Sequence, residues 1–361
     1  MTRLFACLSL LFFLVPVTYV HGPTPPKNNS QYINLEPIRF SSDNPLRTSV
    51  GRLEFLAGWR MTSGNGDFGG ISSMLALADN RFFFLSDAGV LIGFTLDEQN
   101  NKAVRPFIAP LPDGPAKMNE FAKEKWDAES LVYDPRTGQY WVGYEHHHEL
   151  WRYGPSFARK EASQKVPKMQ KWPQNGGAEA MLRLVDQKTG ENRFLVFSEK
   201  APFSKGGYQA LIFDGDPAEP DTKSVRFGYQ PPDGYNLTDA VLFGNDQALL
   251  LHRRFTPLDG VSAILSVAKP SEIKPDRVWT STKIATLKPP MRVDNMEALA
   301  VTEEGGEKII WIASDDNFNA VQETILLKFR LLKGKQKRKG PPAIPGKEKA
   351  GADPGFSSLG Q

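Results

Sequence analysis

Acidic side chains recur in this sequence beside short apolar runs, and one hairpin-like stretch shows the pattern well. Glu129 precedes the apolar run 131–133, a turn with the composition Asp-Pro-Arg-Thr-Gly follows, and the apolar run 140–144 leads to Glu145. Proline, aspartate and glycine favour a turn because they preset φ, cap the backbone and tolerate positive φ, respectively. An antiparallel hairpin of these two runs would place both carboxylates at the same edge.

The arrangement occurs five times, with copies beginning about 50 to 60 residues apart, which is within the range of propeller repeats with loop insertions. At the position of Glu129, the other copies have Ser72, Glu179, Asp239 and Glu297. At the position of Glu145, they have Asp87, Glu199, His252 with Arg253, and Asp315 with Asp316. We expect these side chains to converge if the copies surround one axis.

Carboxylates that converge repel one another, so either some of them hold a proton at a raised pKa or a cation binds among them. Ligation by oxygen alone suits calcium, magnesium or manganese rather than zinc, and calcium is the ion that we expect. Such an ion would hold a phosphate or carboxylate substrate and activate a water, with a carboxylate as the general base. The predicted metal ligands are Asp87, Glu129, Glu179, Asp239, Glu297 and Asp315.

Arginines interrupt the series of acids in the fourth copy. Arg253 and Arg254 stand where the other copies have acids, either as counter-charges to the carboxylates or as a clamp for a phosphate. The alternative for each acid is structural, because acids beside turns often cap strands and accept hydrogen bonds from the backbone of a neighbouring repeat. The predicted catalytic residues are Glu129, Glu145, Glu297 and Arg253.

The elements that must position these residues are short β-strands. A third apolar run follows each hairpin and a fourth follows in several copies, for example residues 224–229 and 282–287. Four antiparallel strands per repeat predict an all-β propeller whose first strands line a central channel. We count five blades, and six is the alternative if residues 32–40 and an insertion form another. The run 52–59 is expected to supply the missing strand of the last blade and close the ring, because an open ring exposes sheet edges.

Other features have two interpretations each. The side chains of His146, His147 and His148 cannot all point one way on a strand, so one or two reach the pocket or all three form an exposed loop. The glycines of residues 65–70 are expected to serve a tight entry into the first strand. The sequence has no G-x-S-x-G nucleophile elbow, which argues against a conventional serine esterase. The tryptophans near the second copy are either packing residues or an aromatic platform: Trp126, Trp141, Trp151 and Trp172.

Composition and charge are those of an ordinary globular protein. Of the 361 residues, 40% are apolar and 24% are charged, and the net charge is +3. This charge is too small to indicate a nucleic-acid partner, and much of the surplus lies in residues 333–339. We expect a monomer that binds a small anionic or ester substrate. Residues 333–361 are predicted to form a basic, Pro/Gly-rich disordered tail.

The N-terminal segment is typical of an exported protein. Residues 1–22 contain Arg3 and an apolar run of about 14 residues, which predicts a signal peptide rather than a spanning helix. An uncleaved anchor is the alternative, and no later segment is expected to cross a membrane. The only cysteine, Cys7, lies in this segment, so the mature domain has no disulfide, which favours a bacterial periplasmic or secreted location. Residues 23–50 are interpreted as a linker with an extra strand as an option, and 51–332 as the propeller.

Several motifs occur in a fixed order along the chain. They are Phe68-Gly69-Gly70-Ile71-Ser72, Asp127-Ala128-Glu129-Ser130, Gly177-Ala178-Glu179-Ala180 and Asn295-Met296-Glu297-Ala298. This set, within about residues 53–332, resembles the phytase-like family named for "esterase-like activity of phytase". The resemblance implies an exported bacterial propeller described as hydrolytic by analogy, and it assigns no catalytic residue. The fourth copy departs from the pattern at residues 252–254.

The leading hypothesis is a metal-assisted hydrolase of phosphoester or carboxylester substrates. Its motivation is the recurrence of acids at equivalent positions. One alternative is a non-catalytic propeller that binds a sugar, a peptide or an envelope component, and another is a sugar-lactone hydrolase of the propeller type.

Overall fold

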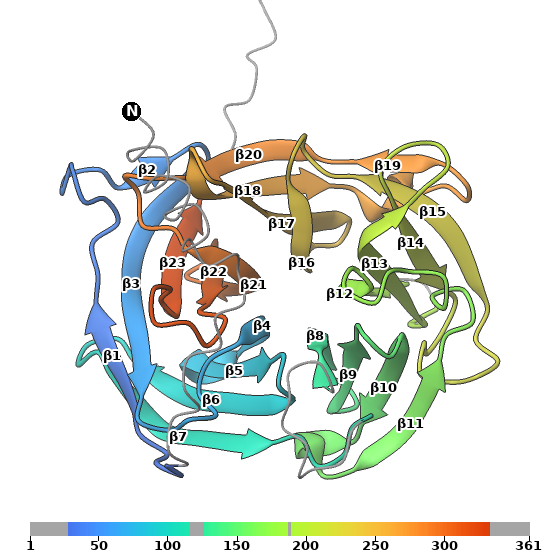
Figure 1. Ribbon diagram of the computed structural model, residues 1–361, viewed down its shortest axis with the longest axis horizontal. Coiled ribbons are helices and arrows are strands. Elements are labelled where there is room, and N and C mark those ends of the chain that lie inside the picture. Colours follow the sequence, from blue (N-terminus) through green and yellow to red (C-terminus); the bar gives the residue numbers. More distant parts are fainter. Residues whose placement is uncertain (1–27, 116–125, 187–188, 333–361) are drawn as a thin grey trace, which may run out of the picture.

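The structure is a computed structural model that describes residues 28–115, 126–186 and 189–332. Within these ranges the chain forms four-stranded antiparallel blades arranged in a ring around a common axis (Figure 1). The predicted signal peptide and the predicted basic tail lie outside the described residues. No helix in the described part of the chain is long and apolar enough to span a membrane.

The blades follow one another along the chain, and each runs from an inner to an outer strand. Blade 1 is β4 (Ile71–Leu77), β5 (Arg81–Ser86), β6 (Val90–Asp97) and β7 (Lys102–Pro110). Blade 2 is β8 (Ala128–Asp134), β9 (Gln139–Tyr144), β10 (Glu149–Tyr153) and β11 (Lys160–Lys165). Blade 3 is β12 (Ala178–Val185), β13 (Asn192–Pro202), β14 (Tyr208–Phe213) and β15 (Ser224–Gln230). Blade 4 is β16 (Asn236–Gly244), β17 (Gln247–Thr256), β18 (Gly260–Ala268) and β20 (Thr282–Leu287).

Blade 5 confirms the predicted ring closure. It consists of β21 (Asn295–Glu304), β22 (Glu307–Asp315), β23 (Ile325–Leu331) and the N-terminal strand β3 (Leu53–Ser63). Strand β3 pairs antiparallel with β23, from Arg60 opposite Ile325 to Leu53 opposite Leu331. The ring is therefore closed by hydrogen bonds between the two ends of the domain.

Three further strands extend existing blades rather than founding a sixth. Strand β1 (Ile33–Pro37) pairs with β3 and touches β7, which joins blades 1 and 5 into one continuous sheet. Strand β2 (Ser49–Val50) pairs with β3, and β19 (Val278–Thr280) adds a parallel strand to β15. These additions cover outer edges that would otherwise be open for pairing with another chain. Five blades account for the described strands.

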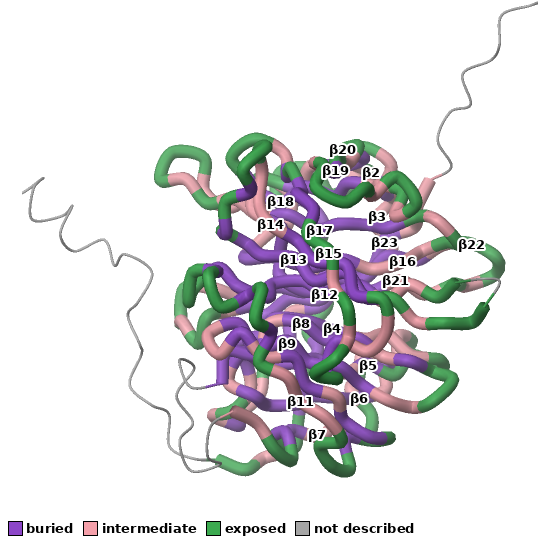
Figure 2. Tube along the Cα trace, turned by 90° about the vertical axis from the view of Figure 1, so that its right-hand side faces the viewer, coloured by how far each residue is buried: buried purple, intermediate pink, exposed green. Residues whose placement is uncertain are grey.

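Hydrophobic packing between adjacent blades holds the ring together. Each of the five interfaces has its own cluster of buried apolar side chains, because successive residues of a strand point to opposite faces of its blade. In β5, Phe82 and Phe84 pack towards blade 5, whereas Leu85 packs towards blade 2. Figure 2 shows buried residues along the strands and exposed residues in the turns.

The four tryptophans near blade 2 are packing residues. Trp126 and Trp151 belong to the interface between blades 1 and 2, and Trp141 and Trp172 belong to that between blades 2 and 3. None of these side chains is more than 5% exposed. They therefore do not form an aromatic platform for a ligand.

Every inner strand has a β-bulge at the same place. The pairing of β8 with β9, for example, passes from Ala128 to Ser130 and leaves Glu129 as the extra residue. A bulge of this kind bends the strand and changes the direction of the extra side chain. The five bulged residues are Ser72, Glu129, Glu179, Thr238 and Glu297.

Candidate functional site

Two sets of equivalent residues meet at the end of the common axis where the inner strands begin. The bulge ring comprises the five bulged residues of the inner strands. The strand-end ring comprises one residue from the second strand of each blade. On the inner strand, one residue directly precedes the bulge, and it pairs with a residue of the second strand; the ring member is the next residue after that partner. The strand-end ring is Asp87, Glu145, Glu199, Arg253 and Asp315.

The register places one of the predicted metal ligands outside the bulge ring. Thr238, and not Asp239, is the fourth member of the bulge ring, because the pairing of β16 with β17 omits Thr238. One oxygen of Asp239 accepts a 2.8 Å hydrogen bond from the backbone N–H of Leu299 in blade 5, and the other accepts one from Ala240. Burial raises the pKa of Asp239 well above its usual value, although these N–H donors act in the opposite direction. Asp239 is thus an inter-blade cap, which is the structural alternative considered for each acid.

The two hydroxyl members of the bulge ring also join adjacent blades. Ser72 Oγ donates a 2.6 Å hydrogen bond to the carbonyl of Ala128 in blade 2. Thr238 Oγ1 donates a 3.1 Å hydrogen bond to the carbonyl of Met296 in blade 5. The bulge ring therefore has three carboxylates and two hydroxyls that are used for blade contacts.

Blades 2 and 3 bring five carboxyl groups together in what we call the carboxylate cluster. Asp127, Glu129 and Glu145 each offer one oxygen within 4.8 Å of the others, and so do Glu145, Glu179 and Glu199. Glu145 belongs to both groups and lies at their centre. All of these residues are buried except Glu129, which is half-buried.

Burial and mutual repulsion make this cluster a strong candidate for binding a cation. The pKa of Glu145 is raised well above its usual value by burial, then by the charges of Glu129 and Asp127. The pKa of Glu179 is raised by burial, then by the charges of Glu199 and Glu145. Glu145 and Glu179 therefore hold their protons to a higher pH than ordinary glutamates do, and a divalent cation would take the place of those protons.

Polar partners from the surrounding strands hold the cluster in place. The backbone N–H of Gly177 donates a 2.7 Å hydrogen bond to Oε1 of Glu145. Asn236 Nδ2 donates a 2.8 Å hydrogen bond to Oε1 of Glu199, whose other oxygen pairs with Lys200. Burial acts to lower the pKa of Lys200, but the charge and hydrogen bond of Glu199, together with the charges of Glu179 and Glu145, outweigh it, so the pKa is raised. The chain thus supplies one lysine charge to a group of five acids.

Arg253 forms the opposite wall of the site. Its Nε lies 2.6 Å from Oε1 of Glu297, and its NH2 lies 3.9 Å from Oε1 of Glu199. Burial acts to lower the pKa of Arg253, but Glu297, Glu199 and Glu179 outweigh it, so the guanidinium stays charged. Since the side chain is 34% exposed, it can also meet an anionic ligand.

The structure brings only part of the predicted metal-ligand set together. Glu129 and Glu179 belong to the carboxylate cluster. Asp87 and Asp315 are buried members of the strand-end ring, in blades 1 and 5, and Asp315 accepts a 2.7 Å hydrogen bond from the N–H of Asn317. Among the described residues, the acids close enough to share an ion do not include Asp87, Asp239, Glu297 or Asp315.

Three members of the carboxylate cluster were missing from the predicted ligands: Asp127, Glu199 and Glu145, the last of which was predicted as a catalytic residue. Glu199 was aligned with Glu145 in the repeat, so the signal for it was present. Asp127 precedes Glu129 by two residues, the spacing that puts side chains on one face of a strand. Its backbone has a φ of 45°, a left-handed conformation that aspartate tolerates better than most residues do.

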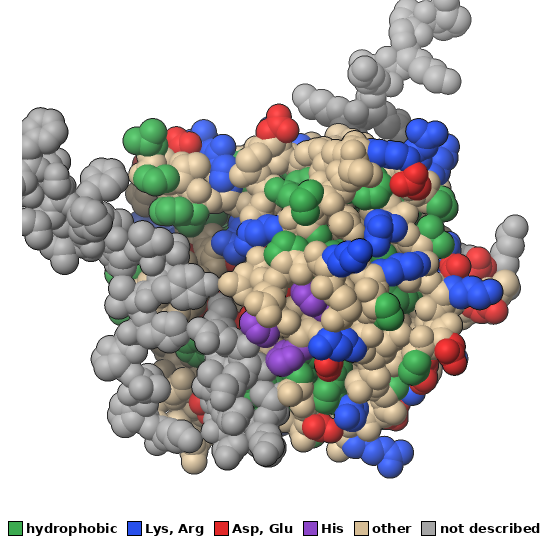
Figure 3. Space-filling model, turned by 45° about the vertical axis from the view of Figure 1, so that its right-hand side comes forward, with side chains coloured by type: hydrophobic (Ala, Val, Ile, Leu, Met, Phe, Trp, Pro, Cys, Tyr) green, Lys and Arg blue, Asp and Glu red, His purple; other side chains and the backbone are tan. Residues whose placement is uncertain are grey.

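The histidines that follow Glu145 lie beside the cluster. His148 is buried, and His146 and His147 are half-buried with ring centroids 5.6 Å apart. Figure 3 shows histidine side chains gathered at one place on the surface, near basic side chains. No histidine is among the described groups that could hold a metal ion.

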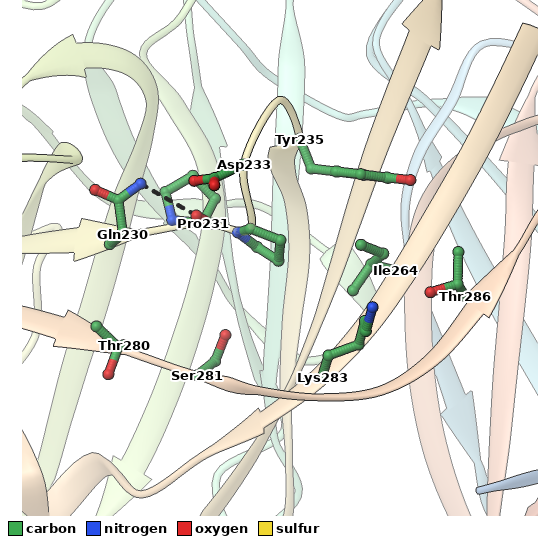
Figure 4. A pocket seen from close by; sticks show the side chains of 10 residues that line it. Gln230, Pro231, Asp233, Tyr235, Ile264, Thr280, Ser281, Lys283 and Thr286 are labelled. Carbon is green, nitrogen blue, oxygen red and sulfur yellow. Dashed lines mark hydrogen bonds between the residues drawn. The ribbon is translucent and has the colours of Figure 1, made fainter. Parts of the chain in front are cut away.

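A cleft between blades 3 and 4 is separate from the carboxylate cluster. It has a volume of about 500 Å³ and is lined by residues that include Tyr235, Ser281 and Lys283 (Figure 4). Behind it, Tyr229 donates or accepts hydrogen bonds with Ser281 Oγ at 2.9 Å and with His252 Nε2 at 2.6 Å. Burial lowers the pKa of His252 to about 4, so this residue is an uncharged core histidine.

The fold and the site together define a five-bladed propeller with an acid-lined end. Residues 66–318 match the family model described as Phytase-like, "Esterase-like activity of phytase". The chain belongs to this family, and its propeller fold confirms the expectation from the resemblance.

Comparison with solved structures finds chains of low similarity. The β-propeller domain of Cps50 (Swd1) from Myceliophteria thermophila is 10% identical with a TM-score of 0.39, over 83% of this chain and 100% of that chain. The α-L-arabinanase of Cellvibrio cellulosa, solved with arabinohexaose, is 10% identical with a TM-score of 0.41, over 72% and 91%. The allergen Mala s 1 of Malassezia sympodialis is 14% identical with a TM-score of 0.40, over 74% and 79%. No curated protein matches the chain.

Proposed function

We propose that this phytase-like propeller is a metal-assisted hydrolase of phosphoester or carboxylester substrates. The observation that carries the proposal is the carboxylate cluster beside a charged arginine. Five acids from two blades would hold a cation, and Arg253 faces the same site from a third blade. A substrate with an anionic or ester oxygen would find a cation on one side and a guanidinium on the other.

The donor set fits a hard divalent cation. All five side chains are carboxylates, which suit calcium, magnesium or manganese, and calcium tolerates the irregular geometry of a site built from two blades. Buried carboxyls with raised pKa are also the groups that gain most when a cation replaces their protons. A cation bound there would polarise an ester or phosphoryl oxygen of the substrate.

The chain's own residues would then orient the substrate and move the proton. The Arg253 guanidinium would bind the ester or phosphate oxygens and stabilise negative charge as it develops there. Glu297, held 2.6 Å from Arg253, is placed to accept a proton from the attacking water. Glu129, at the half-buried edge of the cluster, is the second candidate for this role.

The proposed location is the bacterial periplasm or the cell exterior, as the N-terminal sequence predicts, with the protein as a monomer. The competing function, a non-catalytic binding module, lost its main support when the tryptophans near blade 2 proved to be buried. No contact in the described part of the chain favours it over hydrolysis.

Hydrolysis of p-nitrophenyl phosphate and p-nitrophenyl acetate would test the proposal. We expect turnover that disappears after chelation and returns with calcium, and a loss of about 100-fold or more in Arg253→Gln, which removes a charge-stabilising donor. Glu303→Gln, an exposed acid paired with Lys308 in the β21–β22 hairpin, is the matched control and keeps full activity. Turnover that is insensitive to chelation and to Arg253→Gln would contradict the proposed function.

A further inference from the structure

A third set of equivalent positions borders the site, two residues before the bulged residue of each inner strand. Blades 2, 4 and 5 have polar side chains there, whereas blades 1 and 3 have Gly70 and Gly177. In both glycine blades, atoms from the preceding blade occupy the space that a Cβ would need: the Phe318 ring at Gly70, and Glu145 together with the His148 ring at Gly177. The five positions are Gly70, Asp127, Gly177, Asn236 and Asn295.

The two rings are equivalent in the repeat. A Cβ on Gly70 would lie 2.4 Å from the Phe318 ring, and a Cβ on Gly177 would lie 3.1 Å from Nδ1 of His148. Each ring comes three residues after a member of the strand-end ring, Asp315 or Glu145. Each also has a positive φ, 49° for Phe318 and 54° for His148.

The difference between the two rings lies in their exposure. His148 is only 6% exposed, as expected of a side chain that packs the wall of the site. Phe318 is 37% exposed, although an apolar ring at this place would gain from full burial. Part of Phe318 is therefore open to solvent at the edge of the site.

Asp316 fixes Phe318 in this position. Its Oδ1 accepts 3.0 Å hydrogen bonds from the N–H groups of both Gly70 and Phe318, and its Oδ2 accepts one of 2.9 Å from Thr324. A Cβ on Gly69 would stand 2.6 Å from this carboxylate, so the two glycines make room for both side chains. Strained conformations such as that of Phe318 persist where the surroundings over-determine them, and they concentrate at functional sites.

The Phe318 ring is also close to the acids. The same Cβ on Gly70 would lie 2.5 Å from Oδ1 of Asp87, so the ring edge and this carboxylate are neighbours across Gly70. The carbonyl of Asp87 accepts a hydrogen bond from the N–H of Ala128, which lies between Asp127 and Glu129 of the carboxylate cluster. Contacts through Gly70, Asp87 and Ala128 thus connect Phe318 to the carboxylate cluster.

We propose that Phe318 is a specificity-determining residue whose partly exposed ring stacks on the ring of a substrate. The substrate class is a phosphoester or carboxylester whose alcohol part has a flat apolar ring, with the ester group directed towards the carboxylate cluster. This inference rests on the proposed function, because it takes the cluster and Arg253 as the site of the ester group. Ring stacking at a partly exposed aromatic side chain supplies the preference.

Equilibrium binding of phenylphosphonate, which the proposed hydrolysis cannot cleave, and of inorganic phosphate to the calcium-loaded full chain tests the proposal. Isothermal titration calorimetry should show phenylphosphonate binding about tenfold more tightly than inorganic phosphate. In Phe318→Ala the two ligands should bind equally, with the affinity for inorganic phosphate unchanged. Alanine at this φ has a backbone strain similar to that of phenylalanine, so Phe318→Ala should fold. Phe318→Leu keeps an apolar side chain but removes the ring. The two variants together therefore distinguish loss of ring stacking from loss of folding.

Val321→Ala is the matched control, since Val321 is an 82% exposed apolar residue of the same loop, and it should keep the tenfold preference. Equal binding of the two ligands by the unmodified protein would overturn the role of Phe318 while leaving the proposed function intact. A preference that survives in Phe318→Leu would overturn it as well. Failure of both ligands to bind in the presence of calcium would contradict the proposed function and this inference together.

Discussion

Blades 2 and 4 use the same positions of one repeat for opposite charges. In blade 2, the bulge ring and the strand-end ring have Glu129 and Glu145, two acids that repel each other. In blade 4, the equivalent residues are Thr238, which bonds to the next blade, and Arg253, which pairs with Glu297. The backbone of the repeat determines where side chains meet, and the side chains decide whether a blade attracts a cation or an anion.

The largest effect should come from the cationic blade. Arg253→Gln removes the charge that faces the carboxylate cluster, and loss of a charge-stabilising donor typically lowers turnover by about 100- to 1,000-fold. The rate of p-nitrophenyl ester hydrolysis at saturating calcium measures this effect. Calcium affinity should not fall in this variant, because a cationic neighbour of the acids has been removed; a fall would show that Arg253 supports the cluster instead of opposing it.

The acidic blade should respond in the opposite way. Glu145→Gln removes the carboxylate that belongs to both groups of candidate ligands. Loss of a residue that only hydrogen-bonds to a metal ligand lowers metal affinity by up to about 100-fold. Loss of Glu145 itself should lower calcium affinity by more than that. Calorimetric titration of calcium measures the change. Asp315→Asn is a matched comparison from the same ring, outside the groups that could share an ion, and should bind calcium almost normally. Equal losses in both variants would contradict the placement of the ion between blades 2 and 3.

A smaller effect is expected at Asp239, which joins blades 4 and 5. Asn in its place offers one acceptor oxygen where the backbone N–H groups of Leu299 and Ala240 need two, and an unsatisfied buried group costs about 1–3 kcal/mol. Urea denaturation should show this decrease in the free energy of unfolding, with unchanged calcium affinity. A loss of calcium binding at full stability would return Asp239 to the set of metal ligands.

The smallest effect concerns pH. The pKa values of Glu145 and Glu179 are raised in the folded state, so these groups stabilise the calcium-free protein below the ordinary value of 4.5 and lose that contribution as pH rises through the folded pKa. The double variant Glu145→Gln/Glu179→Gln should therefore flatten the fall in thermal midpoint between about pH 5 and pH 8. Added calcium should flatten it in the unmodified protein too, because the ion needs the deprotonated carboxylates. Identical slopes in the two calcium-free proteins would contradict the raised pKa values.

The sequence was sufficient to predict the propeller, five blades and closure by an N-terminal strand. Apolar runs separated by turn residues mark strands directly, and their fivefold recurrence determines the topology. The recurrence of acids was also enough to place Glu129, Glu145 and Glu179 near one another. These features depend on spacing along the chain.

The finer parts of the site depend on register and on contacts between blades. A single bulge shifts the side chain that faces the common axis by one residue, so Asp239 was aligned where Thr238 stands. Asp127 joins the cluster through a left-handed backbone, and Phe318 is identified only by the glycine of the next blade that it covers. None of these relations has a pattern in the residues of one copy alone.

The most direct test of the central claim is the thermal midpoint of the protein after chelation, then with calcium, magnesium or manganese added back. An ion that binds the folded state alone stabilises it by about 2.7 kcal/mol at a hundredfold excess over its dissociation constant. We predict a clear rise with calcium that is absent in Glu145→Gln and present in Glu303→Gln. If no ion raises the midpoint of the unmodified protein, the carboxylate cluster is not a metal site.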